Sequence, residues 1–225
     1  MNTSPQSGRI PGAEHYREGY VSAGRIFSFA HQTAAALAFK PGTLLEVGVG
    51  TGMVAAMLRT AGVRVSTLDI QPELKPDLLG SILDIPAAAG RFNVALCCQV
   101  LEHLPFEQFS PALRELRRVT TSGLVVSLPD VTRLIYLAYN LPKIGRRSFT
   151  WPCPRLRDPA MPASRMEKMG HFWEIGFRGY PLKRVMNSMV AAGWTVERTW
   201  RVPENPWHRF FRLVPAEAGG SSSPT

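Results

Sequence analysis

The chain has 225 residues, enough for one α/β domain with a large core but hardly for two. Hydrophobic residues make up 45%, as in ordinary soluble proteins, and three cysteines exclude a disulfide framework and favour the reducing cytoplasm. The net charge is +9, and residues 140–212 hold 14 Lys and Arg against 5 Asp and Glu. This basic third is either a solvated surface or a site for an anionic partner, such as a phosphorylated or carboxylated substrate, anionic lipid or nucleic acid.

Both ends of the chain are expected to be disordered tails. Residues 1–12 are rich in Ser, Pro and Gly and contain no apolar run, which excludes a signal peptide or a membrane anchor there. Residues 216–225 are similarly poor in apolar side chains. The longest apolar piece, residues 134–142, is far too short to span a membrane. We therefore expect one domain over residues 13–215, without a transmembrane segment, and its oligomeric state stays open.

Hydrophobic spacing predicts alternating helices and strands over the first 130 residues. The predicted order is a helix at 15–38, strand at 43–48, helix at 51–61, strand at 63–69, short helix after Pro72, strands near 79–83 and at 92–98, helix at 106–119 and strand at 121–128. Such alternation predicts a Rossmann-like, doubly wound and mostly parallel sheet with right-handed crossovers.

After residue 129 this pattern breaks. Residues 130–178 contain many prolines, aromatic residues and arginines without a clean period, and we expect a helix in part of them, at 132–139. A segment of this length is too long for an ordinary connection, so we expect an inserted substrate cap over the carboxyl ends of the strands. A helix at 182–192 and strands at 195–202 and 208–214 follow, which completes a seven-stranded sheet with an antiparallel C-terminal edge.

The most informative stretch is LLEVGVGTG at residues 44–52, which is typical of a buried strand that ends in a tight turn before a helix. Its glycines let the backbone turn sharply and allow a ligand to approach closely. The spacing G-x-G-x-G differs from the G-x-G-x-x-G of dinucleotide sites, so the stretch alone does not define the ligand.

Two later strands end in carboxylates that suit a nucleoside. Asp69 closes the strand at 63–69, near the spacing at which an acid reaches the two ribose hydroxyls. Asp84 follows a short strand and can accept a hydrogen bond from an adenine amino group. Ile70 and Ile85 supply apolar faces for the ring.

The series LLEVGVGTG, TLDI, SILDIP and CCQVLEHLP resembles the motifs of class I S-adenosylmethionine-dependent methyltransferases of the small-molecule type. The resemblance covers about residues 42–130 and rests on four motifs in the correct order. It implies S-adenosylmethionine as cofactor and places Gln99 near the sulfonium, at the floor of the site. It also implies a ribose contact at Asp69 and an adenine contact at Asp84 and Ile85. The residues around the methionine part of the cofactor would be Glu46, Gly48, Gly50 and Gly52.

Two segments offer candidate catalytic residues for the acceptor side. His103 lies four residues after Gln99 and is either a base or a helix-start histidine bonded to backbone. The segment GHFWEIG at 170–176 supplies His171 as a base or acceptor-orienting group, with Glu174 behind it, unless this is a packed hinge with a satisfied polar pair. No metal site is evident, because the cysteines lack C-x-x-C spacing and the histidines are scattered.

The sequence therefore predicts methyl transfer from S-adenosylmethionine to a small or medium-sized acceptor, with an anionic or lipid-linked metabolite in view. Much of the acceleration can come from positioning the acceptor in line with the methyl group. An RNA methyltransferase that grips phosphates with the basic third is a less favoured alternative. A non-catalytic partner protein that keeps the cofactor pocket is a third hypothesis.

Overall fold

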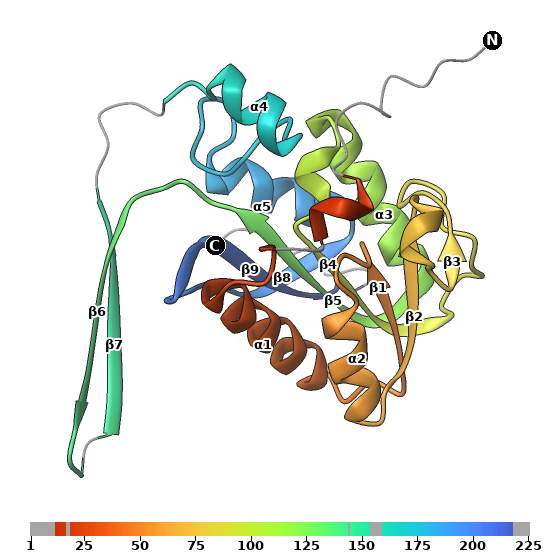
Figure 1. Ribbon diagram of the computed structural model, residues 1–225, viewed down its shortest axis with the longest axis horizontal. Coiled ribbons are helices and arrows are strands. Elements are labelled where there is room, and N and C mark those ends of the chain that lie inside the picture. Colours follow the sequence, from red (N-terminus) through yellow and green to blue (C-terminus); the bar gives the residue numbers. More distant parts are fainter. Residues whose placement is uncertain (1–11, 17–18, 144, 154–158, 218–225) are drawn as a thin grey trace.

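The computed structural model describes residues 12–16, 19–143, 145–153 and 159–217, and its centre is a seven-stranded sheet (Figure 1). The strand order is β3-β2-β1-β4-β5-β9-β8. The strands are β1 (Thr43–Val47), β2 (Arg64–Asp69), β3 (Leu78–Leu79), β4 (Phe92–Cys98), β5 (Thr120–Pro129), β8 (Trp194–Val202) and β9 (Asn205–Pro215). Strands β1 to β5 are parallel and β9 runs antiparallel to both β5 and β8, which confirms the predicted fold class.

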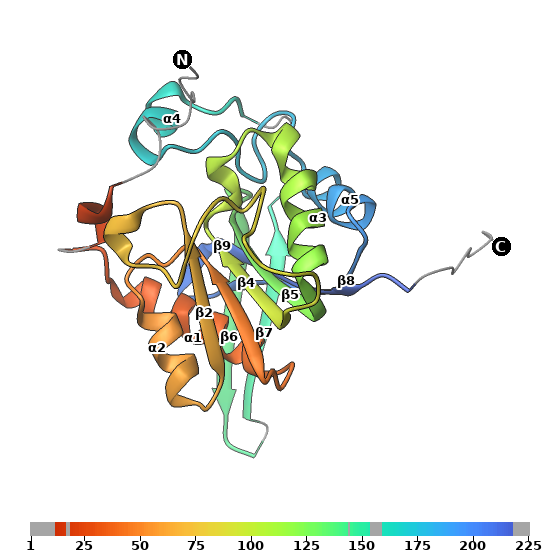
Figure 2. The same cartoon turned by 90° about the vertical axis from the view of Figure 1, so that its right-hand side faces the viewer.

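Helices cover both faces of the sheet, as Figure 2 shows. Helices α1 (Ala23–Leu37) and α2 (Met53–Thr60) pack on one face, and α3 (Phe109–Val119) and α5 (Leu182–Ala191) on the other. Successive strand residues such as Leu44 and Leu45 point to opposite faces, and each is fully buried in a separate core cluster. The strands of this sheet are apolar on both sides because both sides are covered.

Helix α3 illustrates how the sequence specifies this packing. Its buried residues follow helical spacing and form one apolar stripe: Phe109, Ala112, Leu113, Leu116 and Val119. The Trp194 indole at the start of β8 donates a hydrogen bond to the Leu113 carbonyl at 3.0 Å. The antiparallel end of the sheet is thereby tied to the helix that follows the cofactor motifs.

The predicted N-terminal helix is divided in the structure. A short 3-10 helix (Ala13–Tyr16) precedes α1, which begins only at Ala23. Gly19 has a φ of +74°, and the Ser22 hydroxyl accepts a hydrogen bond from the Arg25 amide as the N-cap of α1. The expected third strand at 79–83 is also shorter, because after β3 the chain turns at once. None of the described helices has the length and apolar character needed to cross a membrane.

The helix predicted at residues 132–139 is wrong. This segment is strand β6 (Leu134–Leu141), which pairs with β7 (Gly145–Pro152) as an antiparallel hairpin that projects from the body (Figure 1). The hairpin does not lie over the carboxyl ends of the parallel strands. The later part of the insertion reaches them: Lys168 and Met169 of α4 (Ala163–Met169) and His171 line a cavity there.

One face of the hairpin is apolar and exposed to solvent. Leu137 pairs with Phe149 and Ile135 with Trp151, and all four side chains are between 46% and 58% exposed. The Phe149 and Trp151 rings stack on each other at 5.7 Å between centroids. The outer part of the hairpin therefore contributes little buried area to the body.

We expect that replacing residues 137–149 with a short Gly-Ser linker leaves the thermal unfolding midpoint of the body nearly unchanged. The large apolar side chains described in this range, at Leu137, Tyr139, Leu141 and Phe149, are already exposed, so little apolar burial is lost. As a control, Trp173→Ala should destabilise the protein by about 3–5 kcal/mol, because this fully buried indole packs between Phe106 and Phe109. A large drop in the midpoint for the linker variant would show that the hairpin packs on the body in solution.

Candidate active site

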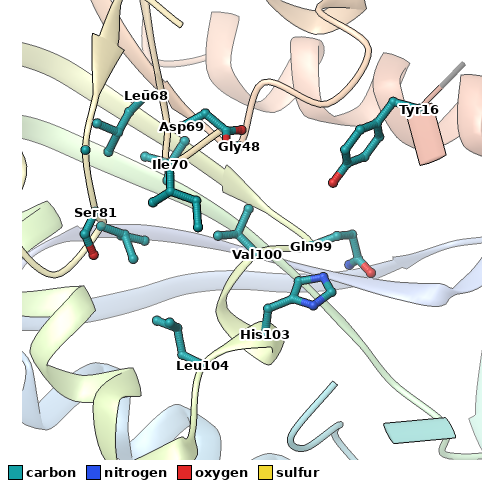
Figure 3. Close-up of a pocket in the computed structure, with 13 residues that line it drawn as sticks. Tyr16, Gly48, Leu68, Asp69, Ile70, Ser81, Gln99, Val100, His103 and Leu104 are labelled. Carbon is teal, nitrogen blue, oxygen red and sulfur yellow. The ribbon is translucent and has the colours of Figure 1, made fainter. Parts of the chain in front are cut away.

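A first cavity opens at the carboxyl ends of β1, β2 and β4 (Figure 3). This edge lies where the strand order reverses between β1 and β4, the usual ligand position in open α/β sheets. The lining residues are Tyr16, Val47, Gly48, Leu68, Asp69, Ile70, Gly80, Ser81, Ile82, Gln99, Val100, His103 and Leu104. The cavity thus combines an acidic group with apolar walls, as a nucleoside requires.

Gly48 is the residue that makes this cavity possible. It follows β1 directly with a φ of +84°, and a Cβ at this position would lie 2.6 Å from Val100 Cγ2. Its amide donates to the Leu68 carbonyl at 2.9 Å. A side chain at Gly48 would both strain the backbone and displace Val100, so only glycine fits.

Asp69 joins the glycine-rich loop to the end of β2. One carboxylate oxygen accepts from the Val49 amide at 2.9 Å and the other from the Gln71 amide at 3.0 Å. A carboxylate has further lone pairs after these two bonds. Asp69 therefore fixes the loop and still offers acceptor sites to a ligand in the cavity that it lines.

A second cavity lies on the other side of the glycine-rich loop and contains Glu46, Gly50 and Thr51. Glu46 is 5% exposed, and its Oε2 has no hydrogen-bond partner among the described residues. Burial raises the pKa of Glu46 to about 8. A buried carboxylate without a matching cation favours a positively charged ligand group beside it.

A third cavity adjoins the first two on the side of the insertion, and we call it the acceptor cavity. Its lining residues are His15, Tyr16, Tyr20, Arg25, Gln99, His103, Lys168, Met169, His171, Trp207 and His208. Tyr16 and Gln99 line all three cavities, so the three meet at these two side chains. Figure 3 shows the Tyr16 hydroxyl and the His103 ring close to Gln99.

The meeting point is held in a defined geometry. Gln99 follows β4 with a φ of +56°, which is uncommon for a residue with a side chain. The backbone amide of Gln99 donates to the Ser127 carbonyl at 3.0 Å, and its side-chain Nε2 donates to Ser127 Oγ at 3.2 Å. Burial raises the pKa of Tyr16 to about 12, so its hydroxyl stays protonated at neutral pH. A residue such as Gln99, which is held in an uncommon backbone conformation by two hydrogen bonds, is typical of a functional position.

His171 and Glu174 form a buried pair beside the acceptor cavity. His171 Nδ1 lies 2.8 Å from Glu174 Oε1, and Glu174 also accepts from Arg165 Nε at 2.8 Å and from Trp207 Nε1 at 3.4 Å. The carboxylate is fully buried, and these three donors compensate its charge. A carboxylate oxygen only accepts, so Nδ1 of His171 donates to Glu174, and Nε2 is the ring nitrogen that takes no part in this pair.

His103 and Glu102 complete this cluster. His103 Nδ1 donates to the Gly170 carbonyl at 3.2 Å, and its ring lies 4.8 Å from that of His171 between centroids. Burial lowers the pKa of His103 to about 4, so its imidazole is neutral. Glu102 is fully buried, and burial raises its pKa to about 7. The structure thus places two imidazole rings and a carboxyl group together beside the acceptor cavity.

The structure brings together most of the predicted site residues, with one clear exception. Glu46, Gly48, Gly50, Asp69, Ile70 and Gln99 line the first two cavities, and Gly52 stands at the start of α2 behind them. Asp84 is exposed and Ile85 is buried elsewhere, and neither lines a cavity. Ser81 and Ile82 occupy the wall where the adenine contact was expected. Ser81 and Ile82 stand in the turn after β3, which ends at Leu79. The sequence predicted that this strand continues to residue 83 and so did not reveal the turn that places these two residues at the cavity.

Other residues of the site carried no sequence signal. Arg165, from α4, and Trp207, from β9, both bind Glu174, and Trp207 also lines the acceptor cavity. His208 is buried beside the acceptor cavity, and burial lowers its pKa to about 4. No motif marks these positions, and the fold alone brings them to the site.

Residues 45–127 match the family model described as a methyltransferase domain. None of the curated proteins compared with this chain matches it. The matched segment contains β2 to β4 and most of β1 and β5, with the glycine-rich loop and Gln99. The match therefore covers the part of the fold that forms the first two cavities.

Several solved structures share the fold at low sequence identity. One is the 1,6-didemethyltoxoflavin-N1-methyltransferase of Burkholderia thailandensis, crystallised with its substrate and S-adenosylhomocysteine, with a TM-score of 0.59, 14% identity and coverage of 91% of this chain and 85% of that chain. Another is the N-methyltransferase NodS of Bradyrhizobium japonicum, with a TM-score of 0.59, 12% identity and coverage of 87% and 89%. The magnesium protoporphyrin IX methyltransferase of Synechocystis has a TM-score of 0.55, 15% identity and coverage of 90% and 92%.

The fold and the family match define the class of this protein. Residues 45–127 are identified as a methyltransferase domain, in agreement with the resemblance found in the sequence. The chain is therefore identified as a methyltransferase.

We expect Glu46→Gln to alter how the stability of the ligand-free protein depends on pH. The folded pKa of Glu46 is about 8 against an ordinary value of 4.5, so the folded state binds this proton more tightly than the unfolded state. The resulting stabilisation is complete below the unfolded value and is lost as pH rises through the folded value. The variant should therefore gain stability relative to the wild type between about pH 5 and pH 8.

The measurement is urea unfolding of both proteins across that pH range. Glu197→Gln serves as the control, because Glu197 is exposed and pairs with Arg212 at the surface. Parallel pH profiles for the wild type and Glu46→Gln would show that Glu46 is not a titrating buried acid.

Proposed function

We propose that this enzyme methylates a small or medium-sized acceptor that carries an anionic group and binds in the acceptor cavity. The supporting observation is that, among the described residues, Tyr16 and Gln99 alone line all three cavities, so the acceptor cavity meets both of the others at these two side chains. Arg25 and Lys168 line it, so a negative group on the acceptor finds two cationic partners. A lipid-linked metabolite with a phosphate fits the same chemistry.

The first two cavities fit the cofactor of the class. S-adenosylmethionine, when bound, supplies an electrophilic methyl group on a positively charged sulfonium. The unpartnered carboxyl oxygen of Glu46 suits a cationic group in the second cavity. The cradle at Gly48, which a Cβ would fill, suits close approach of a ligand to the main chain.

We assign the cofactor contacts accordingly. Glu46, Gly48, Gly50 and Gly52 would surround the methionine part, and Asp69 with Ile70 would hold the ribose side. Ser81 and Ile82, rather than Asp84 and Ile85, would contact the adenine, because they line the first cavity. Gln99 would form the floor at the meeting point.

On the acceptor side, the residues of this chain act mainly by positioning the acceptor and excluding water, and not by forming covalent bonds to it. The Tyr16 hydroxyl and the Gln99 side-chain amide stand at the meeting point. The buried indole of Trp173 donates to the carbonyl of Leu104, the residue after His103, at 3.1 Å. His171 Nε2 is the candidate acceptor-orienting group or base, His103 Nε2 is a second, and Glu174 keeps the His171 proton on Nδ1. In-line alignment of acceptor and methyl group supplies much of the rate.

We expect Asp69→Ala to weaken the binding of S-adenosylhomocysteine by about 1.5–3 kcal/mol, measured by calorimetry. The change removes the ribose acceptor and releases the Val49 and Gln71 amides. Asp84→Ala is the matched control and should bind normally, because Asp84 does not line the cavity. Equal losses of S-adenosylhomocysteine affinity in both variants would show that Asp84 contacts the adenine and would overturn the assignment to Ser81.

The proposed function is tested with methyl-labelled S-adenosylmethionine and pools of anionic metabolites, neutral metabolites, phospholipid-linked compounds and RNA. Label should enter an anionic small-molecule or lipid-linked pool. Lys168→Ala should raise KM for that acceptor several-fold, whereas Lys183→Ala, on α5 outside the cavity, should not. Label in RNA alone would overturn the proposal, and label in no pool would favour a non-catalytic partner protein.

A further inference from the structure

Three side chains beside the acceptor cavity form a group that the proposed reaction leaves without a full explanation. One ligand atom from each of Glu102, His103 and His171 lies within 4.8 Å of the others. His103 and His171 line the acceptor cavity, and Glu102 lies behind them at the end of β4. Glu102 and His103 belong to one 3-10 turn, and His171 comes from the insertion 68 positions later.

The state of Glu102 is the first unusual feature. Its side chain is completely buried, and neither carboxyl oxygen has a hydrogen-bond partner among the described residues. Buried carboxyl groups in folded proteins nearly always have a donor or a cation beside them. The imidazoles of His103 and His171 lie nearby, but neither forms a hydrogen bond with Glu102.

The orientation of the two histidines is the second feature. His103 Nδ1 donates to the Gly170 carbonyl, and His171 Nδ1 donates to the Glu174 carboxylate at 2.8 Å. Each Nε2 atom is thus the ring nitrogen that takes no part in these two hydrogen bonds. Metal-bound histidines usually donate their other ring nitrogen to a carboxylate or a backbone carbonyl, and this cluster contains one example of each.

We propose that Glu102, His103 and His171 bind a divalent transition metal ion beside the acceptor cavity. Two imidazole nitrogens with one carboxylate suit Zn²⁺, Mn²⁺ or Fe²⁺ better than Mg²⁺, which prefers oxygen ligands alone. Around an ion with metal–ligand distances of about 2.0–2.2 Å, the ligand atoms stand roughly 3–4 Å apart. The three ligand atoms here lie within 4.8 Å of one another, so small side-chain shifts bring all three onto one ion. Glu174, held by Arg165, then acts on the ion through His171 as a positioning residue.

The ion would also define the acceptor more closely. Three protein ligands leave positions open, and two of the ligands line the acceptor cavity. An acceptor oxygen that binds the ion at an open position is held beside Gln99, and a hydroxyl group bound in this way has a lowered pKa. We therefore infer an acceptor with a hydroxyl or carboxylate oxygen at or next to the methylated position. This inference rests on the proposed function for the acceptor, whereas binding of the ion is measured without any methyl donor.

The test uses full-length protein stripped with a chelator and titrated with Co²⁺ and with Zn²⁺. We expect one ion per chain by calorimetry and elemental analysis, and visible absorption bands from the Co²⁺ form. Glu102→Gln and His171→Gln should weaken binding at least 100-fold, and Glu174→Gln about 10–100-fold, as expected for an outer carboxylate. His31→Gln is the matched control, because His31 lies on α1 bonded to Trp200.

A second readout keeps the test valid if a variant folds poorly. Saturating Zn²⁺ should raise the unfolding midpoint of the wild type and of His31→Gln but not that of Glu102→Gln. Binding of S-adenosylhomocysteine is measured in parallel on each variant as a check of folding. Less than about half an equivalent of ion in the wild type, or unchanged affinity in Glu102→Gln and His171→Gln, would overturn the proposal. Ion binding without S-adenosylhomocysteine binding would instead contradict the cofactor assignment alone.

Discussion

The site depends on how two neighbouring parallel strands end. Val47 of β1 lies opposite Cys97 of β4, and each strand is followed within two residues by one in the left-handed region, Gly48 and Gln99. Both chains therefore turn away from the sheet at the same level, at the point where the strand order reverses. The turn at Gly48 needs the absence of a Cβ, and the turn at Gln99 is held by two hydrogen bonds to Ser127. Without these two turns, the three cavities would have no common meeting point.

Two buried carboxylates then attach the insertion and the antiparallel strands to that edge. Asp130 follows β5 and pairs with Arg209 of β9, while its other oxygen accepts from Thr132. Glu174 binds Arg165, His171 and Trp207. Asp130 is thereby compensated by protein groups, whereas neither carboxyl oxygen of Glu102 has a hydrogen-bond partner among the described residues. The contrast separates a structural acid from one that needs a further partner.

The sequence predicted the sheet well because its strands are bounded by local signals. Lys40, Pro41 and Gly42 separate α1 from β1, and Gly193 separates α5 from β8. The insertion had no such signals. Its segment LIYLAYNL is apolar except for Asn140, so hydrophobic spacing could not distinguish a helix from a strand. The segment forms a strand because it pairs with residues 145–152, and that pairing is seen only in the folded structure. Residues that act within one loop, such as Gly48, could be predicted. The association of His103 with His171 depends on the path of the whole insertion and could not.

The position of β9 has a consequence for biosynthesis. This strand is late in the chain, yet it lies inside the sheet between β5 and β8. On the ribosome, β5 must remain an unpaired edge until residues 205–215 have emerged, and an unpaired edge invites aggregation. Trp207 and His208 of the same strand also line the acceptor cavity, so a nascent chain could fold its nucleoside half well before its active site exists. A chain that lacks residues 205–215 would therefore lack the wall of the acceptor cavity that Trp207 and His208 supply, even where its first half has folded.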